Sequence, residues 1–243
     1  MAITLRYLIT TLGLWSVVLS AFAQVSPVEK PKEVTLQFSV FSLAGMENLT
    51  YVPKAKAELS DLKFYSAYRS PAYTYHGGSR LCFFEGKETG ADKLAVAIYD
   101  VPEGASKLLL LFFPKSGGAV GGLKYDVYGV DDRIEKAPRG SFSIINVSGR
   151  EYVAQYGASR ISIPQGVSEA HAARGRISLR LAAQIEGGWM STGRHDFSVS
   201  TEDRVTLILY PPGSATGIYP IIRRLTDTLP PEAGKTSDLA QYP

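Results

Sequence analysis

Residues 175–186 have the sequence GRISLRLAAQIE, and this segment indicates the fold class. Apolar and polar residues alternate along it, with the apolar set at Ile177, Leu179, Leu181, Ala183 and Ile185. A helix would spread these side chains around its circumference, whereas a strand places every second side chain on the same face. The segment therefore predicts a β-strand with one buried face and one face in solvent.

The same period of two recurs along the chain. VTLQFSVF at 34–41 alternates in the same way, whereas KLLLLFFP at 107–114 is a continuous apolar run. Such a run is typical of a strand that is covered on both faces. The only helical turn is predicted at 168–175, where Ser168 would be its N-cap. Further strands are predicted at 60–68, 71–76, 79–84, 93–100, 106–113 (which contains the continuous apolar run), 123–130, 140–147, 150–156, 159–163, 194–200 and 203–210. The protein is therefore predicted to be all-β.

Parts of the chain resemble one another. YHGGSRLCFF at 75–84 aligns with QYGASRISIP at 155–164, and residues 93–117 share a strand, polar turn, apolar strand and proline with 194–214. VTLQFSVF and LKYDVYGV, at 123–130, each begin a half with alternation. We therefore predict two tandem immunoglobulin-like antiparallel β-sandwich domains. A single larger sandwich with chance similarity is the alternative.

The first residues have the pattern of an export signal. Arg6 precedes an apolar run at 7–19, and Ala21-Phe22-Ala23 is a small-x-small cleavage site. The run is shorter than the roughly 20 residues of a membrane span, and no later stretch comes closer. We expect a signal peptide at 1–23, a periplasmic or secreted location and no membrane span after cleavage. An uncleaved anchor is the alternative.

Composition divides the rest of the chain. The polar, proline-containing residues 24–33 predict a flexible lead-in, and the glycine-rich residues 115–122 predict a linker. The predicted sandwich domains are therefore 34–114 and 123–225. Residues 226–243 contain too little apolar surface to fold and predict a disordered tail.

Charge and cysteine content exclude several classes of protein. The chain has 26 Lys and Arg against 23 Asp and Glu, a net charge of +3, and its positive charges form no stripe. We therefore expect no nucleic-acid partner. Cys82 is the only cysteine, so no intramolecular disulfide can form, and its apolar neighbours predict a buried, unreactive thiol.

Residues that could carry catalysis are few. His76, His171 and His195 are not spaced with one another, or with Cys82, as ligands of a metal site. GGSRL, at 77–81, lacks the second glycine of a nucleophile elbow. The Asp131, Asp132 and Glu135 cluster is sparse for calcium. We therefore predict no catalytic residue, no metal site, no cofactor and no enzymatic activity, with a hydrolase assembled from distant loops as the alternative.

Aromatic residues are the best candidates for a ligand site. Trp189 lies in the glycine-flanked segment EGGWMSTG, which predicts a turn, and Tyr68, Tyr73 and Tyr75 are grouped in one predicted hairpin. Exposed rings can stack on sugars or on an apolar patch of a partner. These four residues are the predicted ligand-binding residues. Cross-strand packing of the tyrosines is the alternative.

One segment carries a resemblance. PRGSFSIINVSGREYVAQYG at 138–157, together with the export signal and the strand-rich halves, resembles the uncharacterised secreted β-sandwich proteins of Gram-negative bacteria. The resemblance covers mainly residues 120–215, implies location and architecture, and transfers no catalytic residue. We expect an exported, non-enzymatic protein that binds or scaffolds in the periplasm or at the cell surface, with a protein or glycan of the cell envelope as partner. A carbohydrate-binding module that uses exposed aromatics is the alternative.

Overall fold

The fold consists of strands and connections in the part of the chain that the computed structural model describes, residues 33–46, 48–65, 68–86, 94–115, 121–214 and 216–229. No helix capable of crossing a membrane is found among these residues. The strands are β1 (Val34–Ser42), β2 (Leu49–Tyr51), β3 (Ser60–Asp61), β4 (Tyr73–Gly77), β5 (Arg80–Glu85), β6 (Ala97–Asp100), β7 (Lys107–Pro114), β8 (Tyr125–Asp131), β9 (Ser141–Asn146), β10 (Tyr152–Tyr156), β11 (Ser159–Ile163), β12 (Gly166–Val167), β13 (His171–Ala172), β14 (Gly175–Ile185), β15 (Gly188–Val199), β16 (Asp203–Tyr210) and β17 (Ile221–Thr228).

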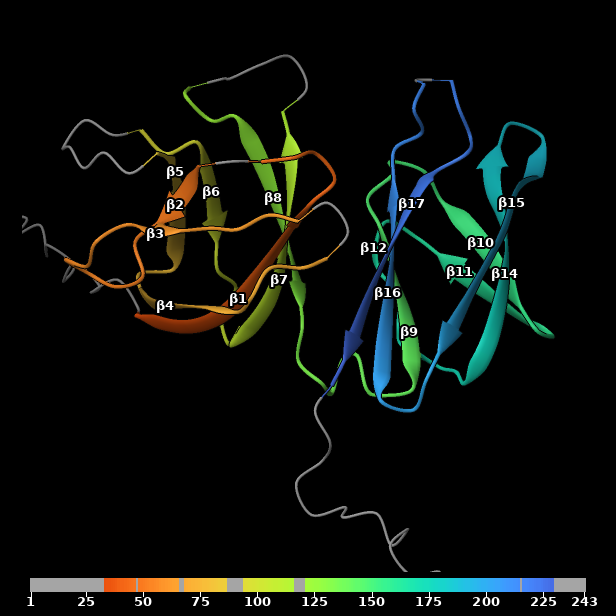
Figure 1. The fold of residues 1–243 in the computed structure, drawn as a ribbon. Helices are drawn as coiled ribbons and strands as arrows, with labels where there is room; N and C mark the ends of the chain where they lie inside the picture. Colours follow the sequence, from red (N-terminus) through yellow and green to blue (C-terminus); the bar gives the residue numbers. More distant parts are fainter. Residues whose placement is uncertain are drawn as a thin grey trace, which may run out of the picture. The chain divides into compact units, whose positions relative to one another are not determined.

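These strands form four sheets (Figure 1). We number them sheet I (β3-β2-β5-β6), sheet II (β4-β1-β7-β8), sheet III (β12-β9-β16-β17, with β13 also paired to β9) and sheet IV (β11-β10-β14-β15). One buried apolar cluster joins sheets I and II, with Phe38, Phe83 and Phe112 at its centre. A second joins sheets III and IV around Phe142 and Phe197. The prediction of an all-β protein of packed sheets is confirmed.

A third apolar cluster joins sheets II and III. It includes Leu109 and Leu111 of β7, and Ile208 and Tyr210 of β16. The alternate residues of β7, among them Leu110, belong to the cluster between sheets I and II. The side chains of β7 therefore contact a core on each face, as the continuous apolar run predicts.

The two halves of the chain pair their strands in the same order. β1 is parallel to β7, which is antiparallel to β8, and β9 is parallel to β16, which is antiparallel to β17. Sheets I and IV also correspond, because β2 pairs with β3 and β5 as β10 pairs with β11 and β14. Each half thus contains one parallel pair among antiparallel neighbours.

One serine in each half forms the same pair of hydrogen bonds with the first strand of that half. The Val40 amide donates to Ser70 Oγ at 2.8 Å, and the Ser70 amide donates to the Val40 carbonyl at 2.9 Å. The Ile144 amide donates to Ser168 Oγ at 2.9 Å, and the Ser168 amide donates to the Ile144 carbonyl at 2.8 Å. Ser168 therefore binds a strand edge, and the helical turn predicted at 168–175 is wrong because β13 and the start of β14 lie there.

This correspondence sets the alignment of the two halves. With Val40 opposite Leu110 and Ile144 opposite Leu207, Ser39 corresponds to Ser143. By the same register, β7 and its terminal proline correspond to β16 and the proline that follows it, as the similarity of 93–117 to 194–214 predicts.

The other two predicted correspondences are wrong. β10 and β11 form a hairpin within sheet IV, whereas β4 pairs with β1 in sheet II and β5 pairs with β2 in sheet I. Gly77 ends β4 and Arg80 begins β5, so the first glycine, serine and arginine lie where the chain crosses between sheets. In the second segment Gly157 lies in a tight turn, and Ser159 and Arg160 begin β11. LKYDVYGV, at 123–130, forms the last strand of the first half, β8, and corresponds to β17 rather than to β1.

The domain limits predicted from composition also change. The described part of 115–122 connects β7 to β8 of one sheet, with Gly121 and Gly122 at positive φ of 60° and 84°, so it is a hairpin connection and not a linker. The chain passes from sheet II to sheet III between β8 and β9. Residues 226–228 belong to β17 and not to a tail. The predicted signal peptide at 1–23, residues 24–32 of the lead-in predicted at 24–33, and residues 230–243 lie outside the described residues.

Tyr210 offers a test of packing between sheets II and III. Its side chain is 2% exposed, its ring lies 5.5 Å from that of Phe113, and its hydroxyl has no hydrogen-bond partner among the described residues. Burial accordingly raises the pKa of Tyr210 far above its ordinary value. We expect Tyr210→Phe to increase the free energy of unfolding by about 1 kcal/mol in urea denaturation. Tyr152→Phe is the control and should decrease it by a similar amount, because the Tyr152 hydroxyl donates to the Ile218 carbonyl. Destabilisation by Tyr210→Phe would mean that this hydroxyl has a partner.

Candidate functional site

Trp189 lies on the solvent face of sheet IV. Residues 186–187 form the turn, and Trp189 is already in β15, opposite Gln184 of β14. The prediction that Trp189 belongs to the turn is therefore wrong by two residues. The side chain remains 44% exposed, because Gln184 points away from the core formed by its neighbours in β14.

A groove of about 460 Å³ lies beside Trp189 on this face. It is lined by Trp189, Arg160 and Arg180 and by the smaller residues Ala182 and Ser191, which are paired across β14 and β15. Pairing places these residues together: Gln155 of β10 lies opposite both Arg160 of β11 and Arg180 of β14. The alternation of the central strands, which buries every second residue, leaves this row of long polar side chains in solvent.

The groove is positively charged. The Arg160 guanidinium lies 5.5 Å from the centre of the Trp189 ring, a cation–π contact that orients the indole. No acidic residue is among the described residues that line the groove, and within the described chain neither Arg160 nor Arg180 forms an ion pair. An anionic group in the groove would therefore meet two uncompensated cations.

Tyr73 and Tyr75 belong to the core of sheets I and II. The Tyr73 ring lies 5.5 Å from that of Phe38, and its hydroxyl accepts a hydrogen bond from the Lys63 amide. Tyr75 is 8% exposed, and its hydroxyl donates to the Gly78 carbonyl at 2.9 Å. Their prediction as ligand-binding residues is corrected, because their rings pack between two sheets.

Tyr68 is exposed but is separated from Trp189 in the fold. It lies in the connection between β3 and β4, next to Arg69, whose guanidinium contacts sheet III through Asp227. Trp189 lies on the outer face of sheet IV, and the core of sheets III and IV intervenes. The structure therefore does not bring the four predicted residues into one site, and only Trp189 lies on the groove.

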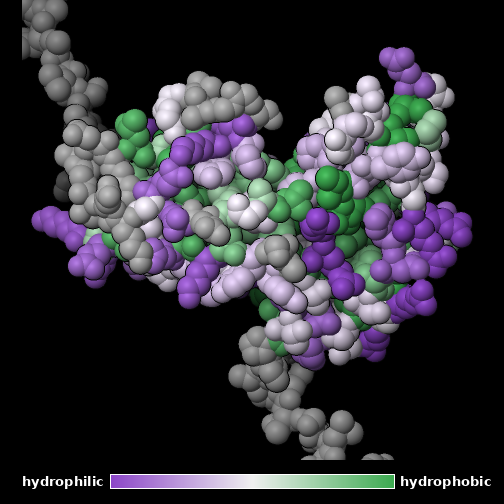
Figure 2. Space-filling model, turned by 45° about the horizontal axis from the view of Figure 1, so that its top comes forward, coloured by the Kyte–Doolittle hydropathy of each residue, from purple (hydrophilic) through white to green (hydrophobic). Residues whose placement is uncertain are grey.

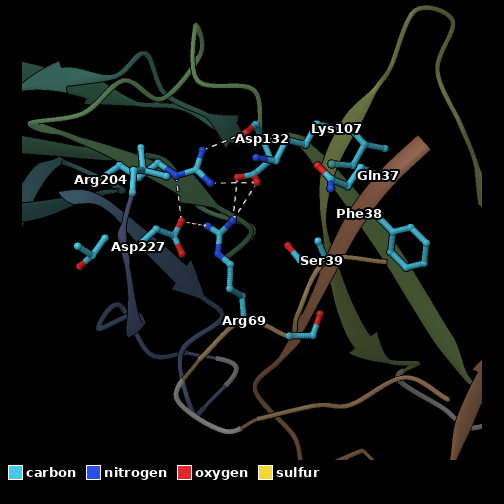
Figure 3. Close-up of a pocket in the computed structure, with 13 residues that line it drawn as sticks. Gln37, Phe38, Ser39, Arg69, Lys107, Asp132, Arg204 and Asp227 are labelled. Atoms are coloured by element: carbon cyan, nitrogen blue, oxygen red, sulfur yellow. Dashed lines mark hydrogen bonds and ion pairs between the residues drawn. The ribbon is translucent and has the colours of Figure 1, made fainter. Parts of the chain in front are cut away.

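A second pocket lies beside a ring of four charged side chains (Figure 3). Arg69 Nη1 donates to both carboxylate oxygens of Asp132 at 2.9 Å, and Arg69 Nη2 lies 2.7 Å from Asp227. Arg204 Nε donates to Asp227 at 2.9 Å, and its Nη2 donates to Asp132 at 3.0 Å. Each arginine thus bridges both aspartates, and the exposed fractions of the four side chains lie between 4% and 15%.

Four separate elements bring this ring together. Arg69 comes from the connection between β3 and β4, Asp132 follows β8, Arg204 is the second residue of β16, and Asp227 lies in β17. Arg204 and Asp227 are directly opposite in the pairing of β16 with β17. No local sequence pattern links these four residues, and the polar composition of 226–243 places Asp227 in the predicted tail, so the ring is not predicted from the sequence.

The three histidines lie on different strands and have separate surroundings. His76 Nδ1 is 2.9 Å from Thr35 Oγ1, and the His171 ring packs 5.3 Å from Phe142. Burial lowers the pKa of His195, which favours its neutral form. In the described part of the chain, no three His, Cys, Asp or Glu side chains are grouped as metal ligands.

Cys82, the acidic residue next to His195 and the predicted acidic cluster each have neighbours that affect their chemistry. Burial raises the pKa of the Cys82 thiol, which keeps it protonated and weakly nucleophilic. Hydrogen bonds from Arg194 hold the pKa of the exposed Asp196 carboxyl at about 2, so Asp196 remains ionised beside His195. Asp131 is paired with Arg133 and Asp132 with the ring, so neither carboxylate is available for calcium in this arrangement.

One face of the molecule is mostly polar. Figure 2 shows hydrophilic and weakly polar residues over most of one face, with apolar residues in patches among them. Exposed large apolar residues come from several separate elements, and include Leu94, Tyr128, Ile134, Val167 and Tyr219. Single exposed apolar residues of this kind are normal on a protein surface.

Comparison with known protein families gave no matching family model, and comparison with curated proteins gave no match.

Proposed function

We propose that this chain is an exported, non-enzymatic protein of two tandem immunoglobulin-like domains that binds a glycan with acidic sugars in the cell envelope. The export pattern at 1–23 supports the location. The common strand order of the two halves and the equivalent serines, Ser70 and Ser168, support the tandem architecture. The separate surroundings of the three histidines support a role in binding rather than in catalysis.

The exposure of Trp189 beside a groove is the observation that carries the proposal. An indole with an open face presents a flat apolar surface, on which the C–H face of a sugar ring can stack. Arg160 orients the indole from one side, and the small side chains of Ala182 and Ser191 leave room beside it. A sugar stacked on Trp189 would therefore have its polar edge close to the arginines.

The arginines favour an acidic sugar over a neutral one. A guanidinium binds a carboxylate through two parallel hydrogen bonds, and Arg180 and Arg160 have no carboxylate partner among the described residues. A hexuronic acid combines the ring and the carboxylate that this groove accommodates.

Trp189 fluorescence gives a direct test. The chain has two tryptophans, Trp15 and Trp189, and Trp15 lies in the proposed signal peptide, so Trp189 alone would report in the mature chain. We expect a saturable fluorescence change with oligogalacturonate and a much weaker one with maltooligosaccharide of equal length. Calorimetric affinity for oligogalacturonate should fall at least about 30-fold in Trp189→Ala, the effect typical of a central aromatic contact.

Two further variants make this test specific. Met190→Ala is the matched control, because Met190 is adjacent, 47% exposed and not part of the groove, and its affinity should equal that of the unmodified protein. Arg180→Gln should weaken oligogalacturonate binding and reduce its dependence on salt. The absence of any glycan response, or an unchanged affinity in Trp189→Ala, would contradict the proposal.

A further inference from the structure

The pocket beside the charged ring has the properties of a separate small-molecule site. Its volume is about 220 Å³, and its lining comes from sheet II, through Ser39 and Lys107, and from sheet III, through Arg204 and Asp227. Ser39 lies in β1 between Phe38 and Val40, which face the core of sheets I and II, so its hydroxyl faces the pocket (Figure 3). The volume corresponds to about seven water-sized groups, which sets the scale of a ligand.

Two buried hydrogen-bond donors at this pocket have no acceptor among the described residues. Ser39 is 6% exposed and its Oγ has no partner in that part of the chain, and Arg69 Nε is also buried without one there. The Nη atoms of Arg69 are occupied by Asp132 and Asp227, so Nε is the guanidinium nitrogen left for a ligand. Buried donors in proteins almost always have acceptors, and a hydroxyl and a guanidinium N–H together suit the oxygens of one carboxylate.

The charge of the lining points to the same chemistry. Three cationic residues, Arg69, Lys107 and Arg204, and two anionic residues, Asp132 and Asp227, line the pocket. Within the described residues Lys107 forms no ion pair. A single negative charge would neutralise the pocket, whereas a dianion would be repelled by the two aspartates.

We propose that this pocket binds a small monocarboxylate, which accepts hydrogen bonds from Ser39 Oγ and Arg69 Nε and is neutralised by Lys107. Since the lining comes from sheets II and III, a bound carboxylate contacts both and stabilises their packing. This site is independent of the groove at Trp189 and would bind its ligand whether or not the protein binds a glycan.

The test uses the full mature chain, with acetate and propionate as probes. Saturation-transfer NMR should detect binding of both, and the thermal unfolding temperature should increase with either in a saturable way. Sodium chloride at equal ionic strength should give no saturable increase, and malonate should bind at least tenfold more weakly than propionate. If neither acetate nor propionate exceeds the effect of chloride, the proposal is wrong.

Variants assign the binding to this pocket. Ser39→Ala and Lys107→Gln should each weaken propionate binding at least tenfold, with an unchanged circular dichroism spectrum. Ser143→Ala is the matched control, because Ser143 holds the corresponding position in β9, is equally buried and does not line the pocket. Lys107→Gln keeps the test decisive if Ser39→Ala does not fold. Propionate binding that neither variant changes, or that Ser143→Ala weakens equally, would overturn the assignment.

Discussion

Replacing Arg204 with methionine is expected to decrease the free energy of unfolding by about 3–5 kcal/mol, as measured by urea denaturation. Arg204 is 4% exposed and donates to Asp227, to the Asp132 carboxylate and, through Nη1, to the Asp132 carbonyl at 3.0 Å. Without it, two buried carboxylates share the single positive charge of Arg69. Methionine retains much of the apolar volume, so the loss reports the missing charge and hydrogen bonds rather than a cavity.

Arg176→Met is the matched control for this prediction. Arg176 also pairs with an aspartate, Asp196, at 3.2 Å, but its side chain is 76% exposed. Solvent screens an exposed pair, so its loss should cost less than about 1 kcal/mol. If the two variants lose equal stability, burial does not make the ring more stabilising than an exposed ion pair.

The sequence predicts strand bounds best where apolar residues recur at every second position or form a continuous run. The strands predicted at 159–163 and 203–210 match β11 and β16 to the residue, and the predicted 175–186 differs from β14 by one residue. The sequence does not predict β2, because three residues are too few to show the two-residue period of a strand. β17 was missed because its Arg223-Arg224 pair and its polar end hide the alternation, and its place is set by pairing with β16.

The sequence does not predict which of the distant strands pair with one another. The glycine, serine and arginine shared by 75–84 and 155–164 suggested one hairpin built twice, yet only the second segment is a hairpin. The correct alignment rests on contacts such as Val40 with Ser70, which join residues far apart in the chain. The charged ring depends on four such segments, so the sequence identified Trp189 and missed the ring.

Phe38→Ala and Phe142→Ala are each expected to decrease the free energy of unfolding by about 3–5 kcal/mol. The two residues correspond in the register of β1 with β7 and of β9 with β16, opposite Leu108 and Val205. Each is fully buried and makes edge-to-face contacts at the centre of its own core, Phe38 with Tyr51 and Phe142 with Phe197, for example. Urea denaturation of the two variants measures the loss.

Hydrogen exchange of the same variants tests whether the two halves are separate modules. The cores around Phe38 and Phe142 share no residue, although sheets II and III contact each other through the third cluster. Phe38→Ala should therefore decrease protection of amides in β5 of sheet I and leave β14 of sheet IV unchanged, and Phe142→Ala should do the reverse. Equal loss of protection in β5 and β14 would show that the four sheets unfold as one cooperative unit. That result would contradict the proposed tandem domains even though their strand order is the same.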